Sequence, residues 1–269
     1  MPVSQQTLSF PGAPIERRGQ AGMPLASAAV ALFHGFTSGP HSVAPWAQAL
    51  AEAGARVEVP LLPGHGTRWE DLESVQAEEL RATARDTVDT LLNQHPDVAV
   101  AGLSMGGALA LDAAAHRPVI ATVVVNPALR FASPLAPLAP ALKHLVRSVA
   151  PIADDLVRPG VSEHAYPRTP VAAVAQLGRI QAAARRGLPR IDSPVLAFAS
   201  RTDHVVPARS ITALGQGLSP GLLTVRPLYN SFHVATLDWD APLIHEESVR
   251  FIAGLLGSRA HRAVQGPRA

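Results

Sequence analysis

The chain has 269 residues, of which 47% are hydrophobic, 16% charged and 4% aromatic, with 25 prolines and no cysteine. This composition predicts one globular domain over residues 1–269 and excludes a disordered chain, disulfides and cysteine chemistry. The formal net charge is only +2, so nucleic-acid binding is not favoured. We expect a cytoplasmic protein, because the N-terminal residues lack a signal pattern and no run is apolar for long enough to span a bilayer.

Strand and helix patterns alternate through the first half of the chain. A proline-glycine turn within 5–18 predicts a peripheral hairpin. Buried strands are expected over 28–33 and 56–60, from residue 98, and over 119–125, with helices over about 41–53, 70–94 and 108–116. Because the buried strands are apolar on both faces, the pattern predicts an α/β fold with a mostly parallel central sheet and helices on both sides.

The alternation stops between residues 127 and 192. This segment is rich in proline, contains short helical fragments and ends with a helix from about 171 to 186. We interpret it as an inserted helical lid (cap), not a separate domain, because the sheet pattern resumes afterwards. The later elements are a strand over 194–200, a helix to 217, a strand over 222–226 and a helix from 242 to about 256. Residues 258–269 are polar and basic and are expected to form a disordered tail.

A serine lies where the strand from residue 98 meets the alanine-rich helix. Its surroundings read Gly102-Leu103-Ser104-Met105-Gly106. A strand that turns directly into a helix strains the backbone and brings the two segments close together, so glycine is needed on both sides of the serine. The turn raises the Ser104 hydroxyl above the sheet, and the helix directs N–H groups, including that of Met105, toward an oxyanion. The same spacing also arises by chance, so a base and an acid must be found elsewhere.

A serine hydroxyl needs a base, and histidine is the usual one near neutral pH. The chain has 11 histidines. His233 differs from the others because it follows the last predicted strand, from where its ring can reach back over the carboxyl ends of the sheet. His34 and His65 lie in glycine-flanked turns and are expected to brace loops. The remaining histidines are expected to be surface or packing residues.

The residue that orients His233 should be an acid at the end of another strand. Asp203 fits, because it follows the apolar strand that ends at Ser200. Asp192 precedes that strand and would lie at its wrong end. Asp238 and Asp240 follow His233 too closely to be assigned. Ser104, Asp203 and His233 are therefore the predicted catalytic residues.

Several segments together resemble the α/β-hydrolases of the bacterial monoacylglycerol lipase and small carboxylesterase group. They are His34-Gly-Phe-Thr37, Pro60-Leu-Leu-Pro-Gly-His-Gly-Thr67, Gly102-Leu-Ser-Met-Gly-Gly107, Asp203-His-Val-Val-Pro207 and Asn230-Ser-Phe-His-Val-Ala-Thr-Leu-Asp238. The order serine, aspartate, histidine is also the one expected of this fold. The resemblance implies that the backbone N–H groups of Phe36 and Met105 form the oxyanion hole.

The segment Val161-Ser-Glu-His-Ala-Tyr-Pro-Arg-Thr-Pro170 resembles the monoacylglycerol lipase lid. The resemblance implies that Glu163 contacts a glycerol head group, and the alternative is a solvent-exposed lid carboxylate. The predicted lid also carries many leucines and valines. These either seal the sheet edge or line an acyl tunnel, and the sequence does not separate the two uses.

Together these features predict a serine hydrolase that cleaves carboxylic esters through an acyl-enzyme, with monoacylglycerols or similar single-chain fatty esters as substrates. The alternatives are a general carboxylesterase, another triad enzyme such as an acyltransferase, lactonase or haloperoxidase, and a non-catalytic ligand-binding member of the fold. The serine excludes an aspartate-nucleophile dehalogenase. We expect no cofactor, metal or nucleic-acid partner, and at most a transient contact of the lid with a lipid surface.

Overall fold

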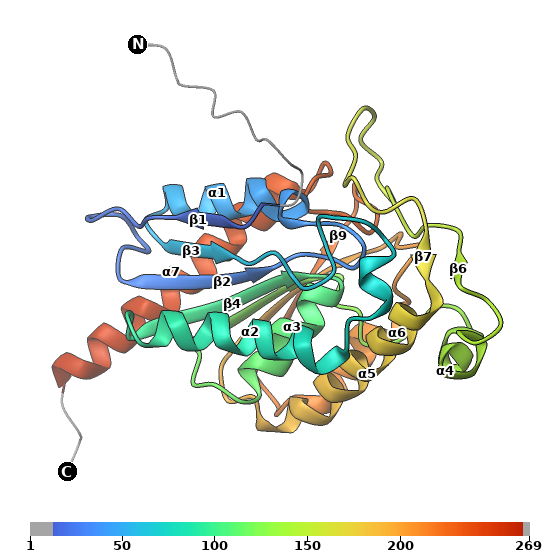
Figure 1. Ribbon diagram of the computed structural model, residues 1–269. Helices are drawn as coiled ribbons and strands as arrows, with labels where there is room; N and C mark the ends of the chain where they lie inside the picture. Colours follow the sequence, from blue (N-terminus) through green and yellow to red (C-terminus); the bar gives the residue numbers. More distant parts are fainter. Residues whose placement is uncertain (1–12, 266–269) are drawn as a thin grey trace.

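A seven-stranded sheet forms the centre of the computed structural model, which describes residues 13–265 (Figure 1). Its strands lie in the order β1 (Ile15–Arg17), β3 (Arg56–Val59), β2 (Ala28–Phe33), β4 (Asp97–Leu103), β5 (Ala121–Val125), β8 (Val195–Ser200) and β9 (Leu223–Leu228). β1 pairs antiparallel with β3, and the other neighbours are parallel. The predicted mostly parallel α/β sheet is confirmed.

Helices cover both faces of this sheet because alternate strand residues point to opposite sides. In β2, Ala29, Ala31 and Phe33 belong to one buried cluster, whereas Val30 and Leu32 belong to the other. The first cluster packs beneath α2 (Ala77–Leu92), α3 (Met105–Ala114), α5 (Val171–Gly187) and α6 (Arg209–Gly217). The second packs beneath α1 (Ala44–Glu52) and α7 (Ala241–Gln265). Within residues 13–265, none of these helices is long and apolar enough to cross a membrane.

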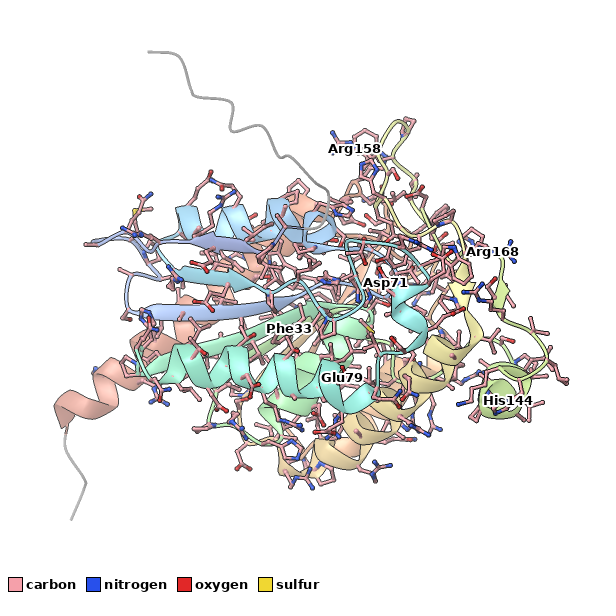
Figure 2. All side chains as sticks on the ribbon, in the orientation of Figure 1. Phe33, Asp71, Glu79, His144, Arg158 and Arg168 are labelled. Atoms are coloured by element: carbon pink, nitrogen blue, oxygen red, sulfur yellow. The ribbon has the colours of Figure 1, made fainter. Side chains whose placement is uncertain are left out.

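The segment expected to form a lid divides into two structurally different parts. Helix α5 belongs to the main body, because Ile180 and Ala184 are fully buried and the helix packs against α3. The preceding residues carry only short elements: η3 (Ala136–Leu138), α4 (Ala139–Leu142), β6 (Ser148–Val149) and β7 (Thr169–Pro170). Figure 2 shows His144, Arg158 and Arg168 at the outer rim of this part, away from the sheet. We call residues 130–168 the cap arm.

Three boundaries differ from those expected. Ile15–Arg17 pairs with β3 and not within a hairpin, while the first half of the predicted hairpin lies outside the described residues. Short 3₁₀ turns, η1 (Pro40–Val43), η2 (Asp71–Glu73) and η4 (Leu188–Arg190), replace parts of predicted helices or loops. Helix α7 continues to Gln265, where a disordered tail was expected from Ser258. The side chain of Arg259 bonds Asp97 at 3.1 Å, which ties the continued helix to the start of β4.

Candidate active site

Ser104 occupies the tight turn between β4, which ends at Leu103, and α3, which begins at Met105. Its backbone has φ 55° and ψ −115°, a conformation that costs a non-glycine residue about 1–3 kcal/mol. The flanking glycines allow this geometry. A Cβ on Gly102 would lie 2.2 Å from the Gly106 oxygen, and one on Gly106 would lie 2.0 Å from the Phe33 oxygen. Both positions therefore require glycine, as the sequence pattern predicted.

The structure brings Ser104, His233 and Asp203 together from three distant segments. His233 Nε2 lies 2.9 Å from Ser104 Oγ, and His233 Nδ1 lies 2.9 Å from Asp203 Oδ2. With the proton on Nδ1, the ring donates to the carboxylate and accepts from the serine hydroxyl. The other Asp203 oxygen accepts the N–H groups of Val205 (2.9 Å) and Val206 (2.7 Å), so the loop after β8 fixes the carboxylate.

The His233 imidazole is buried beside several carboxylates. Burial alone opposes its charged form, but the hydrogen bond and charge of Asp203, with further contributions from Glu163 and Asp155, raise its pKa above the ordinary 6.5. These carboxylates therefore favour the protonated form of the ring. A neutral ring is needed to accept a proton from a hydroxyl, so the pKa of His233 would set the acidic limit of any reaction in which this ring acts as the base.

The loop after β2 lies beside Ser104, and two buried histidines hold it. His65 Nε2 accepts the N–H of Thr37 at 3.3 Å, and His34 Nε2 accepts the N–H of Leu62 at 3.2 Å. The two rings meet edge to face, with centroids 5.0 Å apart. Burial lowers the pKa of both imidazoles, that of His65 to about 4, so both stay neutral acceptors at neutral pH. The expected bracing role of these histidines agrees with these contacts.

Phe36 and Met105, the two predicted oxyanion donors, come from the braced loop and from the start of α3. Phe36 lines the same cavity as Ser104. Met105 is the first residue of α3, and the first N–H groups of a helix have no acceptor within the helix. The helix dipole adds partial positive charge at this end. Both residues therefore belong to segments that flank the serine.

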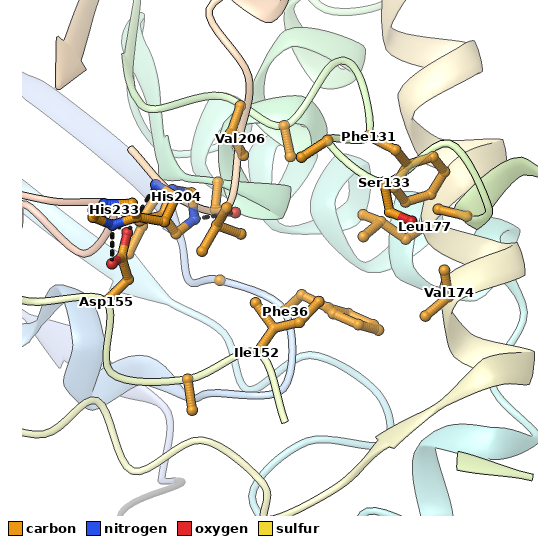
Figure 3. A pocket seen from close by; sticks show the side chains of 18 of the residues that line it. Phe36, Phe131, Ser133, Ile152, Asp155, Val174, Leu177, His204, Val206 and His233 are labelled. Atoms are coloured by element: carbon orange, nitrogen blue, oxygen red, sulfur yellow. Dashed lines mark hydrogen bonds and ion pairs between the residues drawn. The ribbon is translucent and has the colours of Figure 1, made fainter. Parts of the chain in front are cut away.

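A cavity of about 490 Å³ extends from Ser104 beneath the cap arm (Figure 3). Figure 3 shows Phe36 and Ile152 on one side and Phe131, Val174 and Leu177 on the other. Its lining is mainly apolar, as is usual for sites that bind small molecules, with polar groups beside Ser104 and others, Arg130, Ser133 and Gln181, farther along the lining. The apolar residues Val174 and Leu177 of α5 therefore line a cavity, whereas Ile180 seals the sheet.

Glu163 lines this cavity and is buried, so the alternative of a solvent-exposed carboxylate does not apply. Its Oε1 accepts the N–H of Asp154 at 3.0 Å, and its own N–H donates to Asp154 Oδ1 at 2.7 Å. Its carbonyl oxygen accepts from Ser38 Oγ at 2.8 Å and from His41 Nε2. Burial raises the pKa of the Glu163 carboxyl to about 7.

Sequence reasoning missed two residues that support this site. Asn126, with φ 45°, donates from Nδ2 to the His233 carbonyl at 2.8 Å and accepts the Ser200 N–H at 2.8 Å. Asp155 of the cap arm accepts the backbone N–H of His233 at 3.1 Å. No motif marks either residue. The one usable signal was that Asn126 directly follows a buried strand at the carboxyl edge of the sheet.

The other acids that were compared with Asp203 do not contact the His233 ring; two of them bond backbone amides and one is exposed. Asp192 is exposed, at the opposite end of β8. Asp240 accepts the N–H of Asn230 at 2.8 Å. Asp238 is buried and accepts backbone N–H groups, including that of Phe232 at 3.1 Å. Among these acids, only Asp203 contacts the His233 ring.

Comparison with known proteins agrees with this geometry. Residues 30–247 match the model of the alpha/beta hydrolase family. A thermostable monoacylglycerol lipase of Bacillus sp. strain H-257 is 41% identical over 225 residues, which cover 83% of this chain and 90% of that protein. A carboxylesterase of Bacillus subtilis strain 168 is 24% identical over 230 residues, which cover 84% of this chain and 93% of that protein.

Solved structures give the same result. One from a study of LipS and LipT, two metagenome-derived lipolytic enzymes, has a TM-score of 0.84 and 35% identity, covering 90% of this chain and 98% of that chain. The monoacylglycerol lipase of Paleococcus ferrophilus, at 19% identity, has a TM-score of 0.75 with coverage of 90% and 98%. At this low identity, the similarity to the Paleococcus ferrophilus protein shows only that the two chains share a fold.

The chain belongs to the alpha/beta hydrolase family. Within that family it is a carboxylic ester hydrolase of the bacterial monoacylglycerol lipase and small carboxylesterase group. The resemblance drawn from the sequence motifs is confirmed.

The buried His65 predicts a stability that depends on pH. Unfolded His65 binds a proton near pH 6.5, whereas the folded residue stays neutral down to about pH 4. Acidification through this window therefore favours the unfolded state, by about 2 kcal/mol between pH 7 and pH 5. In His65→Gln, the side-chain oxygen can accept the Thr37 N–H but does not titrate. Denaturant unfolding at both pH values should show a smaller loss for the variant. An equal loss in both proteins would contradict this.

Proposed function

We propose that this ester hydrolase cleaves monoacylglycerols or similar single-chain fatty esters, with Ser104, His233 and Asp203 as its catalytic triad. The observation that supports it most is the cavity, whose lining is mainly apolar and which contains both Ser104 and the buried Glu163. An acyl chain can pack against apolar residues such as Phe131, Val174 and Leu177, and a small polar head group can bond Glu163. The high identity to a monoacylglycerol lipase agrees with this choice.

The reaction begins with proton transfer. His233 takes the proton of the Ser104 hydroxyl, whose oxygen attacks the ester carbonyl carbon. The backbone N–H groups of Phe36 and Met105 stabilise the tetrahedral oxyanion, and Asp203 stabilises the imidazolium. His233 then protonates the departing alcohol, which leaves an acyl group on Ser104. Water repeats the sequence with His233 as base, releasing the fatty acid and restoring the serine.

Glu163 is proposed to bind the head group. Its carboxyl lines the same cavity as Ser104 and is held by the Asp154 N–H, so it is available to a polar head group bound near the serine. Because its pKa is about 7, the carboxylate and the carboxylic acid coexist near neutral pH. Either form can bond a glycerol hydroxyl, the ionised form as an acceptor and the protonated form also as a donor.

The cap arm is proposed to make transient contact with a lipid surface. Several large apolar side chains are exposed on it: Leu135, Leu138, Leu145, Val146, Val149, Ile152 and Val157. Leu145 is 85% exposed, and Lys143 lies near it, while Arg147 pairs with Glu73. Exposed apolar groups beside a cation suit an interface between apolar chains and polar head groups. Ile152 of this surface also lines the cavity, so the cap arm contributes both to the exposed apolar surface and to the site.

The triad is tested by two substitutions. Ser104→Ala should abolish hydrolysis of a chromogenic short-chain ester, and Asp203→Asn should lower kcat by about four orders of magnitude, because the ring then adopts the wrong tautomer. Circular dichroism should show both variants folded. Asp192→Asn, which removes an exposed acid at the other end of β8, should keep full activity. An active Ser104→Ala variant would refute the triad.

Head-group selectivity is tested by Glu163→Gln. The ratio of kcat/KM for a monoacylglycerol to that for an ethyl ester of the same acid should fall about tenfold or more, since hydrogen bonds to charged groups are worth about 1.5–3 kcal/mol. Glu246→Gln, an exposed position on α7, serves as the control. An unchanged ratio would favour a general carboxylesterase. Transfer of the acyl group to an added alcohol in preference to water would favour an acyltransferase.

A further inference from the structure

Asp155 connects the cap arm to both loops that carry the catalytic acid and base. Its Oδ2 accepts the backbone N–H of His233 at 3.1 Å and that of His204 at 3.2 Å. Its Oδ1 lies 2.7 Å from Nδ1 of the His204 ring. Its carbonyl oxygen accepts the N–H of Val234 at 3.1 Å. We call the loop after β9 that carries His233 the base loop. Asp155 thus accepts hydrogen bonds from two consecutive amides of the base loop, those of His233 and Val234, and from the amide of His204, the residue directly after Asp203.

These contacts form a closed cycle of hydrogen bonds that includes Asp203 and His233. Asp203 bonds the His233 ring, the His233 backbone bonds Asp155, and Asp155 bonds the residue that follows Asp203. The loops after β8 and β9 are therefore fixed relative to one another through a third segment. Figure 3 shows Asp155 directly below His204 and His233, with dashed lines from its carboxylate.

A second buried carboxylate strengthens the same connection. Asp238 accepts the N–H groups of Val157 (2.8 Å) and Arg158 (3.0 Å) from the cap arm. It also accepts those of Phe232 (3.1 Å) and Trp239 (2.9 Å) from the base loop. Residues 155–158 are thus attached to the base loop on both sides of His233. Each carboxylate satisfies several amides at once, which a neutral side chain cannot do equally well.

We propose that Asp155 is a positioning residue of the ester hydrolase, which aligns His233 with Asp203 and adds a further negative charge near the imidazolium formed during the reaction. The proposal rests on the catalytic triad proposed above. Asp155 does not bond the imidazole itself, so its effect on the reaction passes through the His233 backbone and through its electric field. Its side chain is 15% exposed, and a charge so little screened acts strongly on its neighbours.

The negative charge of Asp155 changes the pKa of His233 in a definite direction. The charged groups that face the His233 ring are Asp203 from the β8 loop and Asp155 and Glu163 from the cap arm. Asp154 and the His204 ring lie beside these carboxylates. Each carboxylate raises the pKa of His233, so loss of the Asp155 charge lowers it. Because the reaction needs neutral His233 in the free enzyme, the acidic limb of kcat/KM then moves to lower pH.

The test is a pH profile of kcat/KM on a soluble short-chain ester for wild type and Asp155→Asn. The variant should lose about tenfold in kcat, and its acidic limb should move to lower pH. Asp192→Asn removes the same charge from an exposed site and should match wild type. The proposal would be overturned if Asp155→Asn had the kcat of the wild type and the same acidic limb in its pH profile of kcat/KM. A lower kcat with an unmoved limb would overturn it too, because that outcome describes a purely structural residue.

His204→Ala keeps the proposal testable if Asp155→Asn does not fold. This variant removes the side-chain partner but leaves the Asp155 charge, so kcat should fall severalfold while the limb does not move to lower pH. A downward shift like that expected of Asp155→Asn would show that the charge is not the cause. The triad is judged separately, by the activities of Ser104→Ala and Asp203→Asn, whatever the Asp155 variants do.

Discussion

The close approach of β4, α3 and β2 around Ser104 is the constraint on which the rest of the site depends. Without a side chain at Gly106, the start of α3 lies against the Phe33 backbone, and the serine reaches a backbone conformation that few side chains adopt. That single turn places the hydroxyl, the N-terminus of α3 and the loop after β2 within one small volume. A rigid hydrophobic sheet beneath it holds the strained residue in place.

Buried polar side chains fix the loops above the sheet by hydrogen bonds. His34 and His65 fix the loop that carries Phe36, while Asn126, Asp155 and Asp238 fix the loop that carries His233. Each of these groups bonds backbone amides or carbonyls, which is how irregular loops satisfy their main-chain polar groups when no strand is adjacent. Residues 155–158 consequently attach the cap arm to the loop that carries His233.

The sequence was most informative where chemistry limits the choice of residue. The glycines around Ser104 and the strand-end positions of Asp203 and His233 were predictable, because sterics and sheet topology leave few alternatives. Helix α5 was assigned to the lid because strand periodicity was absent around it, although its fully buried Ile180 packs it into the main body. Asp155 and Asn126 were not predictable, since their partners are backbone amides and carbonyls far away in the chain. The end of α7 was missed because the residues from Ser258 onward are polar and basic and carry little apolar periodicity.

The central claim, that Ser104 is activated by its surroundings to form a covalent acyl-enzyme, is tested most directly by mass spectrometry of the protein after reaction with a fluorophosphonate. Such reagents modify a serine only when a base and an oxyanion hole activate it. The account predicts one adduct per chain, on the peptide that contains Ser104, and none in Ser104→Ala. An adduct on another residue, or an unmodified chain, would contradict it.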